Sequence, residues 1–183
     1  MGDLPEPLLT EAQIAERVAE LAVQISRDYA GKGEIVLVGV LKGAFIFLAD
    51  LARRITVPRR VDFIALSTYP GTPTEPGAVR LIMDLRLDIA CRHVLVVEDI
   101  VDTGRTLDYL LRTLAARRPA SLRSCALLHK PARRQVAVAP DYLGFEIPDR
   151  WVVGYGLDHA DRFRALPYIG VLPPEALGEP EAD

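Results

Sequence analysis

The chain has 183 residues, half of them hydrophobic, and a formal net charge of −3 at pH 7. This length suits one domain with a sizeable core, and the weak negative charge gives no general attraction to nucleic acid or anionic membranes. Two cysteines are too few for a disulfide framework or a metal cluster, and they favour a reducing, cytoplasmic location. No apolar run approaches the ~20 residues of a membrane helix, and the acidic, proline-containing start is unlike a secretory signal.

The first third of the chain predicts a helix, a buried strand and a second helix. Residues 1–9 show no regular pattern, whereas Thr10 and Gln13 have the spacing of a capping box that begins a helix. The apolar residues that follow recur at helical spacing for several turns. Residues 34–40 then form an apolar run typical of a strand buried on both faces, and a helix is predicted over residues 45–54.

The turn between that strand and the second helix contains Leu41, Lys42 and Gly43. A lysine is unfavourable near a helix N-terminus, because the helix dipole repels positive charge there. Lys42 is therefore either a solvated surface lysine or a residue kept for an anionic ligand.

A strand predicted over residues 61–66 leads through Thr68 and Tyr69 into the segment 70–77, which contains three prolines and two glycines. This segment has no regular pattern, so it is either a flexible surface loop or a mobile lid over a site. The polar residues at its base favour the lid. Residues 79–84 are predicted to return as the second strand of a hairpin.

The most informative stretch is 94–107, where a β-branched strand ends in Glu98 and Asp99 and a polar turn leads into a helix. In open α/β sheets, ligands bind where a central strand passes into a helix. The turn offers hydroxyls and backbone N–H groups at a helix N-terminus, which suit a phosphate group. Its residues are Asp102, Thr103, Gly104, Arg105 and Thr106.

Three carboxylates lie within five positions of this turn, so a simple anion site is excluded. Carboxylates bind sugar hydroxyls or Mg²⁺, and we therefore expect a ligand with a phosphate and a polyhydroxylated or metal-bearing part. The alternative is that Asp102 only caps the helix, while Glu98 and Asp99 are solvated. The chain has neither a Walker A motif nor GxGxxG, which argues against a nucleoside triphosphatase or a Rossmann dehydrogenase.

A strand predicted over residues 121–128 ends at His129 and Lys130. Lys130 is either an exposed turn lysine or a third strand-end cation, and His129 has no second histidine at metal-binding spacing. A polar connector over residues 133–142 leaves room for a short strand. Trp151, the only tryptophan, is either a core residue or a stacking surface for a flat ligand.

The ten residues at 97–106, Val-Glu-Asp-Ile-Val-Asp-Thr-Gly-Arg-Thr, closely resemble the phosphoribosyl-diphosphate signature of the type I phosphoribosyltransferases. Their particular form is similar to that of the hypoxanthine-guanine phosphoribosyltransferases. Leu-Lys-Gly at 41–43, His-Lys-Pro at 129–131 and Trp-Val-Val-Gly-Tyr-Gly-Leu-Asp at 151–158 follow the order and spacing of that family. The resemblance covers roughly residues 34–171.

The resemblance implies an α/β fold with a mostly parallel twisted sheet, helices on both faces, and a small hood formed by the chain ends. We expect one domain over residues 1–183, with its core at about 10–172, a mobile loop at 70–77 and a frayed tail at 173–183. The resemblance, together with apolar helix faces, also implies a homodimer or homotetramer.

For activity, the resemblance implies Mg²⁺-dependent transfer of 5-phosphoribosyl from phosphoribosyl diphosphate to N9 of hypoxanthine or guanine. Asp102 would take the purine N7 proton as general base, with a pKa raised by the neighbouring carboxylates. The residues implied to bind phosphoribosyl diphosphate are Leu41, Lys42, Gly43, Thr68, Tyr69, Glu98, Asp99, Asp102, Thr103, Gly104, Arg105, Thr106 and Arg164. The residues implied to bind the purine are Lys130, Trp151, Val152 and Asp158. The residues implied to bind metal are Glu98, Asp99 and Asp158.

Two other functions remain open. A regulator that kept this fold and binds nucleic acid would need a basic face, which an acidic chain of this length does not predict. A phosphoribosyltransferase for adenine or a pyrimidine is disfavoured by Lys130 and Trp151, because a lysine at the base would select a ring carbonyl. On pattern alone, Arg164 is a surface residue.

Overall fold

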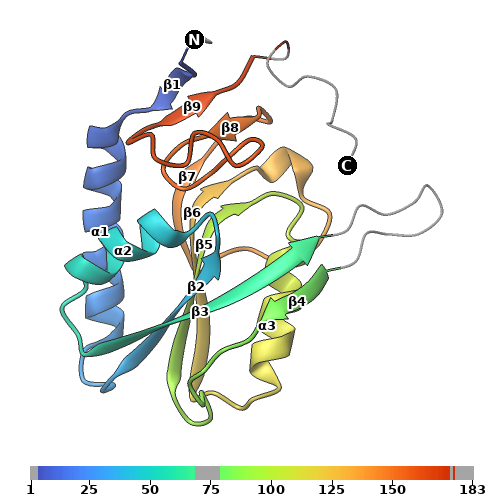
Figure 1. Ribbon diagram of the computed structural model, residues 1–183. Coiled ribbons are helices and arrows are strands. Elements are labelled where there is room, and N and C mark those ends of the chain that lie inside the picture. The colour runs from blue at the N-terminus through green and yellow to red at the C-terminus, as the bar shows by residue number, and fades with distance from the viewer. Residues whose placement is uncertain (1–3, 69–78, 174, 176–183) are drawn as a thin grey trace.

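The computed structural model describes residues 4–68, 79–173 and 175, which form a six-stranded sheet, a three-stranded sheet and three α-helices (Figure 1). The helices are α1 (Glu11–Tyr29), α2 (Phe45–Arg54), α3 (Arg105–Ala115) and a short 3₁₀ helix, η1 (Pro131–Arg133). The strands are β1 (Glu6–Leu9), β2 (Ile35–Leu41), β3 (Arg59–Thr68), β4 (Val79–Met83), β5 (His93–Val101), β6 (Ser121–His129), β7 (Tyr142–Glu146), β8 (Val152–Val153) and β9 (Ile169–Val171).

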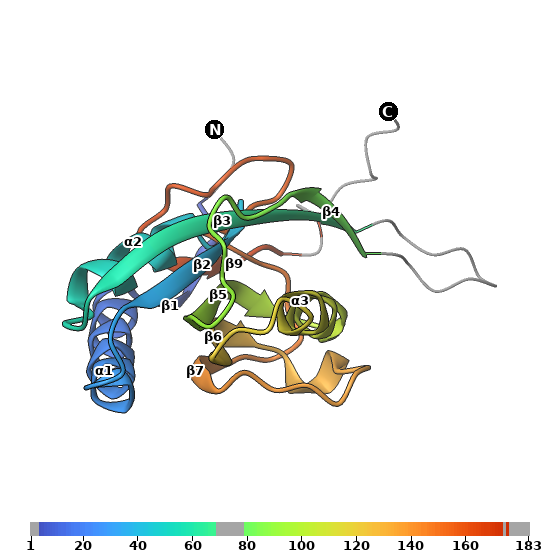
Figure 2. The ribbon, with the colours of Figure 1, turned by 90° about the horizontal axis from the view of Figure 1, so that it is seen from below.

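The large sheet has the strand order β4-β3-β2-β5-β6-β7. Strand β4 is antiparallel to β3, as the predicted hairpin requires, and all other neighbours are parallel. Helices α1 and α2 cover one face of the sheet and α3 covers the other (Figure 2). The predicted fold class, a mostly parallel sheet with helices on both faces, is therefore confirmed.

The central strand β2 is apolar along its whole length because both of its faces are covered. In β2, Val36 and Val38 belong to the core on the α3 side, whereas Ile35 and Leu37 belong to the core under α1 and α2. All four side chains are fully buried. This alternation between two cores is the reason that the strand shows a continuous apolar run in the sequence.

Helix α1 begins as predicted. Thr10 Oγ1 accepts a hydrogen bond from Gln13 N at 3.3 Å, and Gln13 Oε1 accepts one from Thr10 N at 2.9 Å. The capping box satisfies backbone groups that the first turn of a helix leaves without intrahelical partners.

Two strands differ from the prediction. The expectation of no regular structure over residues 1–9 is wrong for Glu6–Leu9, which pair with β9 near the other end of the chain. The connector over 133–142 is irregular or 3₁₀ until its last residue, where β7 begins. Both strands are short and lie at sheet edges, so their pairing depends on distant partners and leaves little local signal.

The small sheet has the order β1-β9-β8 and lies beyond the carboxyl ends of the parallel strands (Figure 1). Strand β1 comes from the start of the chain, and β8 and β9 come from its last third. This confirms the predicted hood formed by the chain ends.

The winding of the chain reverses between β2 and β5. From β2 the chain passes through α2 to β3 on one side, and from β5 it passes through α3 to β6 on the other side and across the opposite face (Figure 2). Such a reversal leaves a crevice at the carboxyl ends of the two diverging strands, which is where open α/β sheets bind ligands.

Candidate active site

Three strand ends predicted to carry functional residues meet at this crevice. Strands β2, β5 and β6 are parallel neighbours, so their carboxyl ends share one edge of the sheet. Lys42 follows β2, Asp102 follows β5 and Lys130 follows β6. The Lys130 backbone N donates a hydrogen bond to Val101 O at 3.0 Å, which holds the end of β6 against the end of β5.

The turn after β5 has an uncapped helix N-terminus. Gly104 is the N-cap of α3, with φ +84°, and as a glycine it has no side chain that could cap the helix. The alternative in which Asp102 caps the helix is therefore wrong. Thr103 Oγ1 accepts from Arg105 N at 3.4 Å, and the first-turn N–H groups of α3 remain suited to an anion.

Two backbone N–H groups of the following connector fix this turn. Thr103 O accepts hydrogen bonds from Gln135 N at 2.9 Å and Val136 N at 3.2 Å. A Cβ added to Gly104 would lie 2.9 Å from Val138 Cγ1, so the connector also packs closely against the turn. A glycine is needed here both for its positive φ and for this close approach.

The carboxylates at the end of β5 are withdrawn from solvent. Glu98 is buried, and its Oε2 has no hydrogen-bond partner among the described residues. Burial raises the pKa of Glu98 well above its ordinary value, and the charge of Asp99 raises it further. Burial likewise raises the pKa of Asp99 to about 6, while its hydrogen bond from Ile100 N (2.8 Å) lowers it. Perturbed carboxylates of this kind cluster at functional sites.

Glycines bring three segments of the site into contact. A Cβ on Gly43 would lie 1.5 Å from Asp99 Oδ2, so the loop after β2 rests directly on that carboxylate. A Cβ on Gly156, whose φ is +107°, would lie 1.9 Å from Gly43 O. The loop after β2 therefore lies between the end of β5 and the hood, and its Leu41–Lys42 peptide bond is cis.

Asp102 is half-buried and has an arginine beside it. Arg133 Nε lies 3.0 Å from Asp102 Oδ1, although without the alignment of a hydrogen bond. Arg133 Nη1 also lies 3.6 Å from Asp149 Oδ1, whose carboxylate is 3.9 Å from Lys130 Nζ. An ionic chain thus runs from Asp102 to Lys130.

Lys130 is not an exposed turn residue, since its side chain is only 7% exposed. Its ammonium has no hydrogen bond to the described residues, which leaves its donors for a ligand. Trp151 is not a core residue, because it is 48% exposed, and its ring makes an edge contact with His159. Val152, next to it, is buried in β8.

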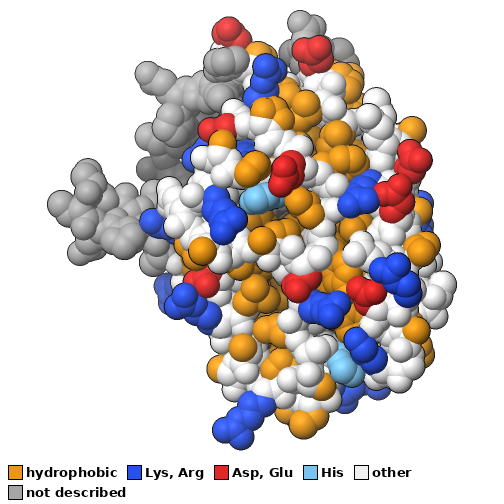
Figure 3. Space-filling view, turned by 180° about the vertical axis from the view of Figure 1, so that it is seen from behind, with side chains coloured by type: hydrophobic (Ala, Val, Ile, Leu, Met, Phe, Trp, Pro, Cys, Tyr) orange, Lys and Arg blue, Asp and Glu red, His pale blue; other side chains and the backbone are white. Residues whose placement is uncertain are grey.

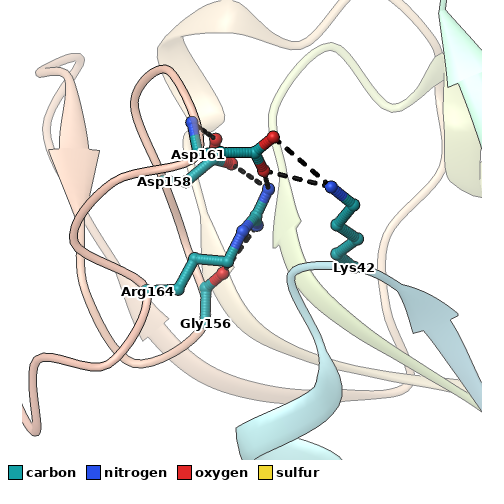
Figure 4. A network of polar contacts seen from close by, with 5 residues as sticks. All are labelled: Lys42, Gly156, Asp158, Asp161 and Arg164. Atoms are coloured by element: carbon teal, nitrogen blue, oxygen red, sulfur yellow. Dashed lines mark hydrogen bonds and ion pairs between the residues drawn. The ribbon is translucent and has the colours of Figure 1, made fainter.

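Lys42 and Arg164 belong to one polar network with two aspartates (Figure 4). Arg164 Nη2 lies 2.8 Å from Asp158 Oδ1 and 2.9 Å from Asp161 Oδ1, and its Nη1 donates to Gly156 O at 2.9 Å. Lys42 Nζ lies 3.1 Å from the same Asp161 oxygen. These contacts hold the Arg164 side chain within the site, so Arg164 is not a free surface arginine.

Some predicted site residues lie outside the described part of the chain. These are Tyr69 and the predicted lid at 70–77. Thr68 is the last residue of β3 and pairs with Val79. Among the described residues, no group of three or more His, Cys, Asp or Glu side chains could hold a metal ion by itself. In the same part of the chain, no helix is long and apolar enough to cross a membrane.

The sequence did not single out Arg133, Asp149 and Asp161, although each contacts a predicted site residue. All three are exposed charges, Arg133 at the end of η1 and the two aspartates in loops, a pattern that usually indicates a solvated surface. The sequence offers a local indication only for Asp161, which stands three residues before Arg164. The contacts of Arg133 and Asp149 become apparent only when the positions of β6 and β7 in the fold are known.

Comparisons with known proteins agree with this geometry. A family model described as the phosphoribosyl transferase domain matches residues 6–160. A hypoxanthine-guanine phosphoribosyltransferase from Mycobacterium tuberculosis is 49% identical over 178 residues, covering 94% of this chain and 88% of that protein. A hypoxanthine phosphoribosyltransferase from Salmonella typhimurium is 48% identical over 166 residues, covering 90% of this chain and 93% of that protein.

Solved structures give the same result. The crystal structure of a hypoxanthine phosphoribosyltransferase from Staphylococcus aureus superposes with a TM-score of 0.91 at 43% identity, covering 97% of this chain and 96% of that one. A mutant of the Trypanosoma cruzi hypoxanthine phosphoribosyltransferase, solved as a ternary substrates complex, gives a TM-score of 0.88 at 45% identity, covering 93% and 96%. With the domain match and these identities over nearly the whole chain, this protein belongs to the phosphoribosyltransferase family, within its hypoxanthine-guanine phosphoribosyltransferase branch of transferases.

Proposed function

We propose that this protein transfers 5-phosphoribosyl from phosphoribosyl diphosphate to N9 of hypoxanthine or guanine, giving IMP or GMP and diphosphate. The observation that carries the proposal is the buried ammonium of Lys130, which has no hydrogen bond among the described residues and lies at the same sheet edge as the buried Glu98 and the partly buried Asp99 of β5. Its ionic contact with Asp149 at 3.9 Å leaves the donors of the ammonium available, and a purine ring carbonyl is an acceptor that adenine lacks.

The sugar phosphate would bind at the end of β5. The 5′-phosphate would be held by the residues at the start of α3, namely Thr103, Gly104, Arg105 and Thr106. Glu98 and Asp99 would accept hydrogen bonds from the ribose hydroxyls. The uncapped helix start and the unpartnered Glu98 oxygen support these roles.

The diphosphate would bind between the loop after β2 and the hood. Lys42 and Arg164 are the cations there, and Leu41 and Gly43 would supply backbone contacts. Their positive charge would stabilise the leaving diphosphate as the bond from its oxygen to ribose C1′ breaks. We include Thr68 and Tyr69 in this subsite on the basis of the sequence motif alone.

The purine would lie between Trp151 and the strand ends. Lys130 would donate to the exocyclic oxygen, the Trp151 ring would stack on the base, and the Val152 backbone would read its edge. As the bond between purine N9 and ribose C1′ forms, Asp102 would accept the proton that leaves N7. Arg133 Nε, 3.0 Å from Asp102 Oδ1, is the cation next to this carboxylate.

We propose Mg²⁺ as the cofactor, bound through Glu98, Asp99 and Asp158 together with substrate oxygens. The donor set fits, because Glu98 has a buried oxygen without a partner and Asp99 is destabilised by burial when charged. Mg²⁺ prefers oxygen ligands and usually binds through one or two carboxylates plus phosphates and water. When bound, it would neutralise charge on the diphosphate. Asp158 is paired with Arg164 here and would exchange that contact for the metal.

A nucleic-acid-binding regulator is the alternative function. The face in Figure 3 shows Lys and Arg side chains interspersed with Asp and Glu among its described residues, not gathered into a continuous basic surface. Binding to a nucleic-acid backbone needs such a surface, so this face does not support the alternative.

We also propose that the protein assembles as a homodimer or homotetramer and acts in the cytoplasm. Exposed apolar side chains at one edge of the large sheet support assembly. The two cysteines, Cys91 and Cys125, are free thiols, which suits a reducing compartment.

Turnover with a panel of bases tests the proposed function. With phosphoribosyl diphosphate and Mg²⁺, we expect hypoxanthine and guanine to react and adenine and uracil to react at least about 100-fold more slowly, because a hydrogen-bonding site rejects a base that lacks its acceptor. Lys130→Ala should abolish this discrimination. Adenine turnover equal to that of hypoxanthine, or unchanged discrimination in the variant, would contradict the proposal.

A further inference from the structure

The two cations proposed for the diphosphate share one carboxylate in this structure. Asp161 Oδ1 lies 3.1 Å from Lys42 Nζ and 2.9 Å from Arg164 Nη2 (Figure 4). Lys42 follows β2 and Arg164 lies between β8 and β9, so the two cations come from the main sheet and from the hood region. The carboxylate therefore joins the two sides of the proposed diphosphate subsite.

Arg164 does not depend on Asp161 for its position. It donates to Gly156 O and pairs with Asp158, and its side chain is only 21% exposed. The side chains of Asp161 and Lys42 are both 68% exposed. Exposed ion pairs contribute little to stability, so the Asp161 carboxylate can leave the two cations at low cost.

The backbone of Asp161 is fixed so that its carboxylate lies on both cations. Its N–H donates to Asp158 Oδ2 at 2.8 Å, and its φ is +55°. Its Oδ1 lies within hydrogen-bond distance of both Arg164 Nη2 and Lys42 Nζ, so one carboxylate oxygen is shared by the two cations.

Carboxylate and phosphate oxygens compete for the same donors, since both accept charge-assisted hydrogen bonds from lysine and arginine. We propose that Asp161 is a built-in competitor of the diphosphate group, which occupies Lys42 and Arg164 in the free protein and is displaced when phosphoribosyl diphosphate binds. The inference rests on the proposed function and assigns a role to a residue that this function does not use. Its consequence is weaker diphosphate binding and faster diphosphate release after transfer.

Calorimetric titration with inorganic diphosphate and Mg²⁺ tests the inference. Asp161→Asn removes the charge, tolerates the positive φ and keeps the backbone N–H, which still donates to Asp158 Oδ2. We expect the variant to bind diphosphate about 3- to 10-fold more tightly than wild type, the range expected from losing exposed ion pairs. Product inhibition by diphosphate should strengthen by the same factor.

Two controls separate competition from other effects. Asp84→Asn removes a carboxylate from an exposed pair with Arg117 and should leave diphosphate affinity unchanged, which excludes an effect of net charge alone. In a Lys42→Gln background, the gain from Asp161→Asn should shrink, because one of the two contested donors is gone.

Equal diphosphate binding by Asp161→Asn overturns the inference, because it would show that the carboxylate does not compete with diphosphate. Weaker binding also overturns it, because it would show that Asp161 positions the two cations for the ligand. Unchanged affinity for IMP and an unchanged melting temperature show that the variant is folded. If wild type turns over hypoxanthine normally while Asp161→Asn leaves diphosphate affinity unchanged, only this inference fails. If wild type neither turns over hypoxanthine nor binds IMP, the proposed function fails.

Discussion

Glu98 and Asp99 are adjacent carboxylates that the fold largely removes from water, and neither forms an ion pair with another described residue. Burial disfavours their charged forms and raises both pKa values, that of Asp99 to about 6. For an acid whose pKa is higher in the folded state, the folded state loses relative stability as pH rises through that range. The two carboxylates therefore destabilise the fold at neutral pH, as expected of groups that serve a ligand or metal.

Asp99→Asn should stabilise the protein at neutral pH. Asparagine removes the buried charge and also its effect on Glu98, while its Oδ1 can still accept from Ile100 N. We expect the free energy of unfolding at pH 7.5 to rise by on the order of 2 kcal/mol, since each pKa unit corresponds to about 1.4 kcal/mol. The gain should shrink as the pH falls through about 6 and disappear below about 3.8, where Asp99 is protonated in the folded and the unfolded state alike. Urea unfolding at both pH values measures this.

The exposed carboxylate of Asp84 provides the control, and Asp84→Asn should show no gain at either pH. Turnover of Asp99→Asn should fall even though its stability rises. Superimposable unfolding curves for wild type and Asp99→Asn at pH 7.5 would show that the buried charge carries no cost.

At this scale the sequence predicts the residues of the motifs but not the partners that surround them. From the sequence, only the family resemblance favoured a functional role for Lys130 over an exposed turn lysine and for Trp151 over a core residue. In the structure Lys130 is buried and Trp151 is exposed, which excludes both of these structural alternatives. Arg133 reaches the site from the short helix η1 and Asp161 from a loop, and the positions of both segments depend on the whole fold, so neither contact follows from local pattern.

At the scale of elements, a segment could be predicted when its own residues determine its environment. Strands β2 and β5 are buried on both faces, and the sequence therefore contains an apolar run in each of them. The start of α1 is marked in the sequence by its capping box. Strand β1 has four residues and takes its structure from β9, near the other end of the chain, so local pattern could not reveal it. The hood depends on this pairing, because β9 lies between β1 and β8.

Deleting residues 1–9 should weaken the hood and purine binding together. Strand β1 pairs along β9, and Leu8 and Leu9 pack against the main core. Loss of these contacts should cost about 2 kcal/mol or more, which lowers the melting temperature by at least about 4 °C. Because Trp151 and Val152 lie at β8, the KM for hypoxanthine should rise more than the KM for phosphoribosyl diphosphate. Steady-state kinetics and thermal unfolding measure both effects.

Leu4→Ala is the matched control within the same segment, since Leu4 is exposed, and it should change neither quantity. An unchanged KM for hypoxanthine in the deletion variant, with a lowered melting temperature, would separate the hood's stability from purine binding. That result would contradict the proposed link between β1 and the purine subsite.

At the scale of the whole molecule, no other element among residues 4–68, 79–173 and 175 covers one edge of the large sheet. Val61 and Phe63 are alternate residues of β3, so they face the same side, and both are exposed. Exposed large apolar residues also occur at Phe45 at the start of α2 and at Ile82 in β4, the neighbour of β3. Exposed apolar surface of this kind marks interfaces, and homo-oligomers most often bury it against a second copy.

We therefore expect light scattering to give the mass of a dimer or tetramer, and Val61→Glu to give a monomer, because a buried unpaired carboxylate would disrupt the contact. Val23→Glu places the same charge on an exposed apolar position of α1 and should keep the wild-type mass. A wild-type monomer would exclude assembly through any surface. An oligomer whose mass Val61→Glu leaves unchanged would show instead that the copies meet elsewhere, and that the apolar edge of β3 and β4 stays exposed in the assembly.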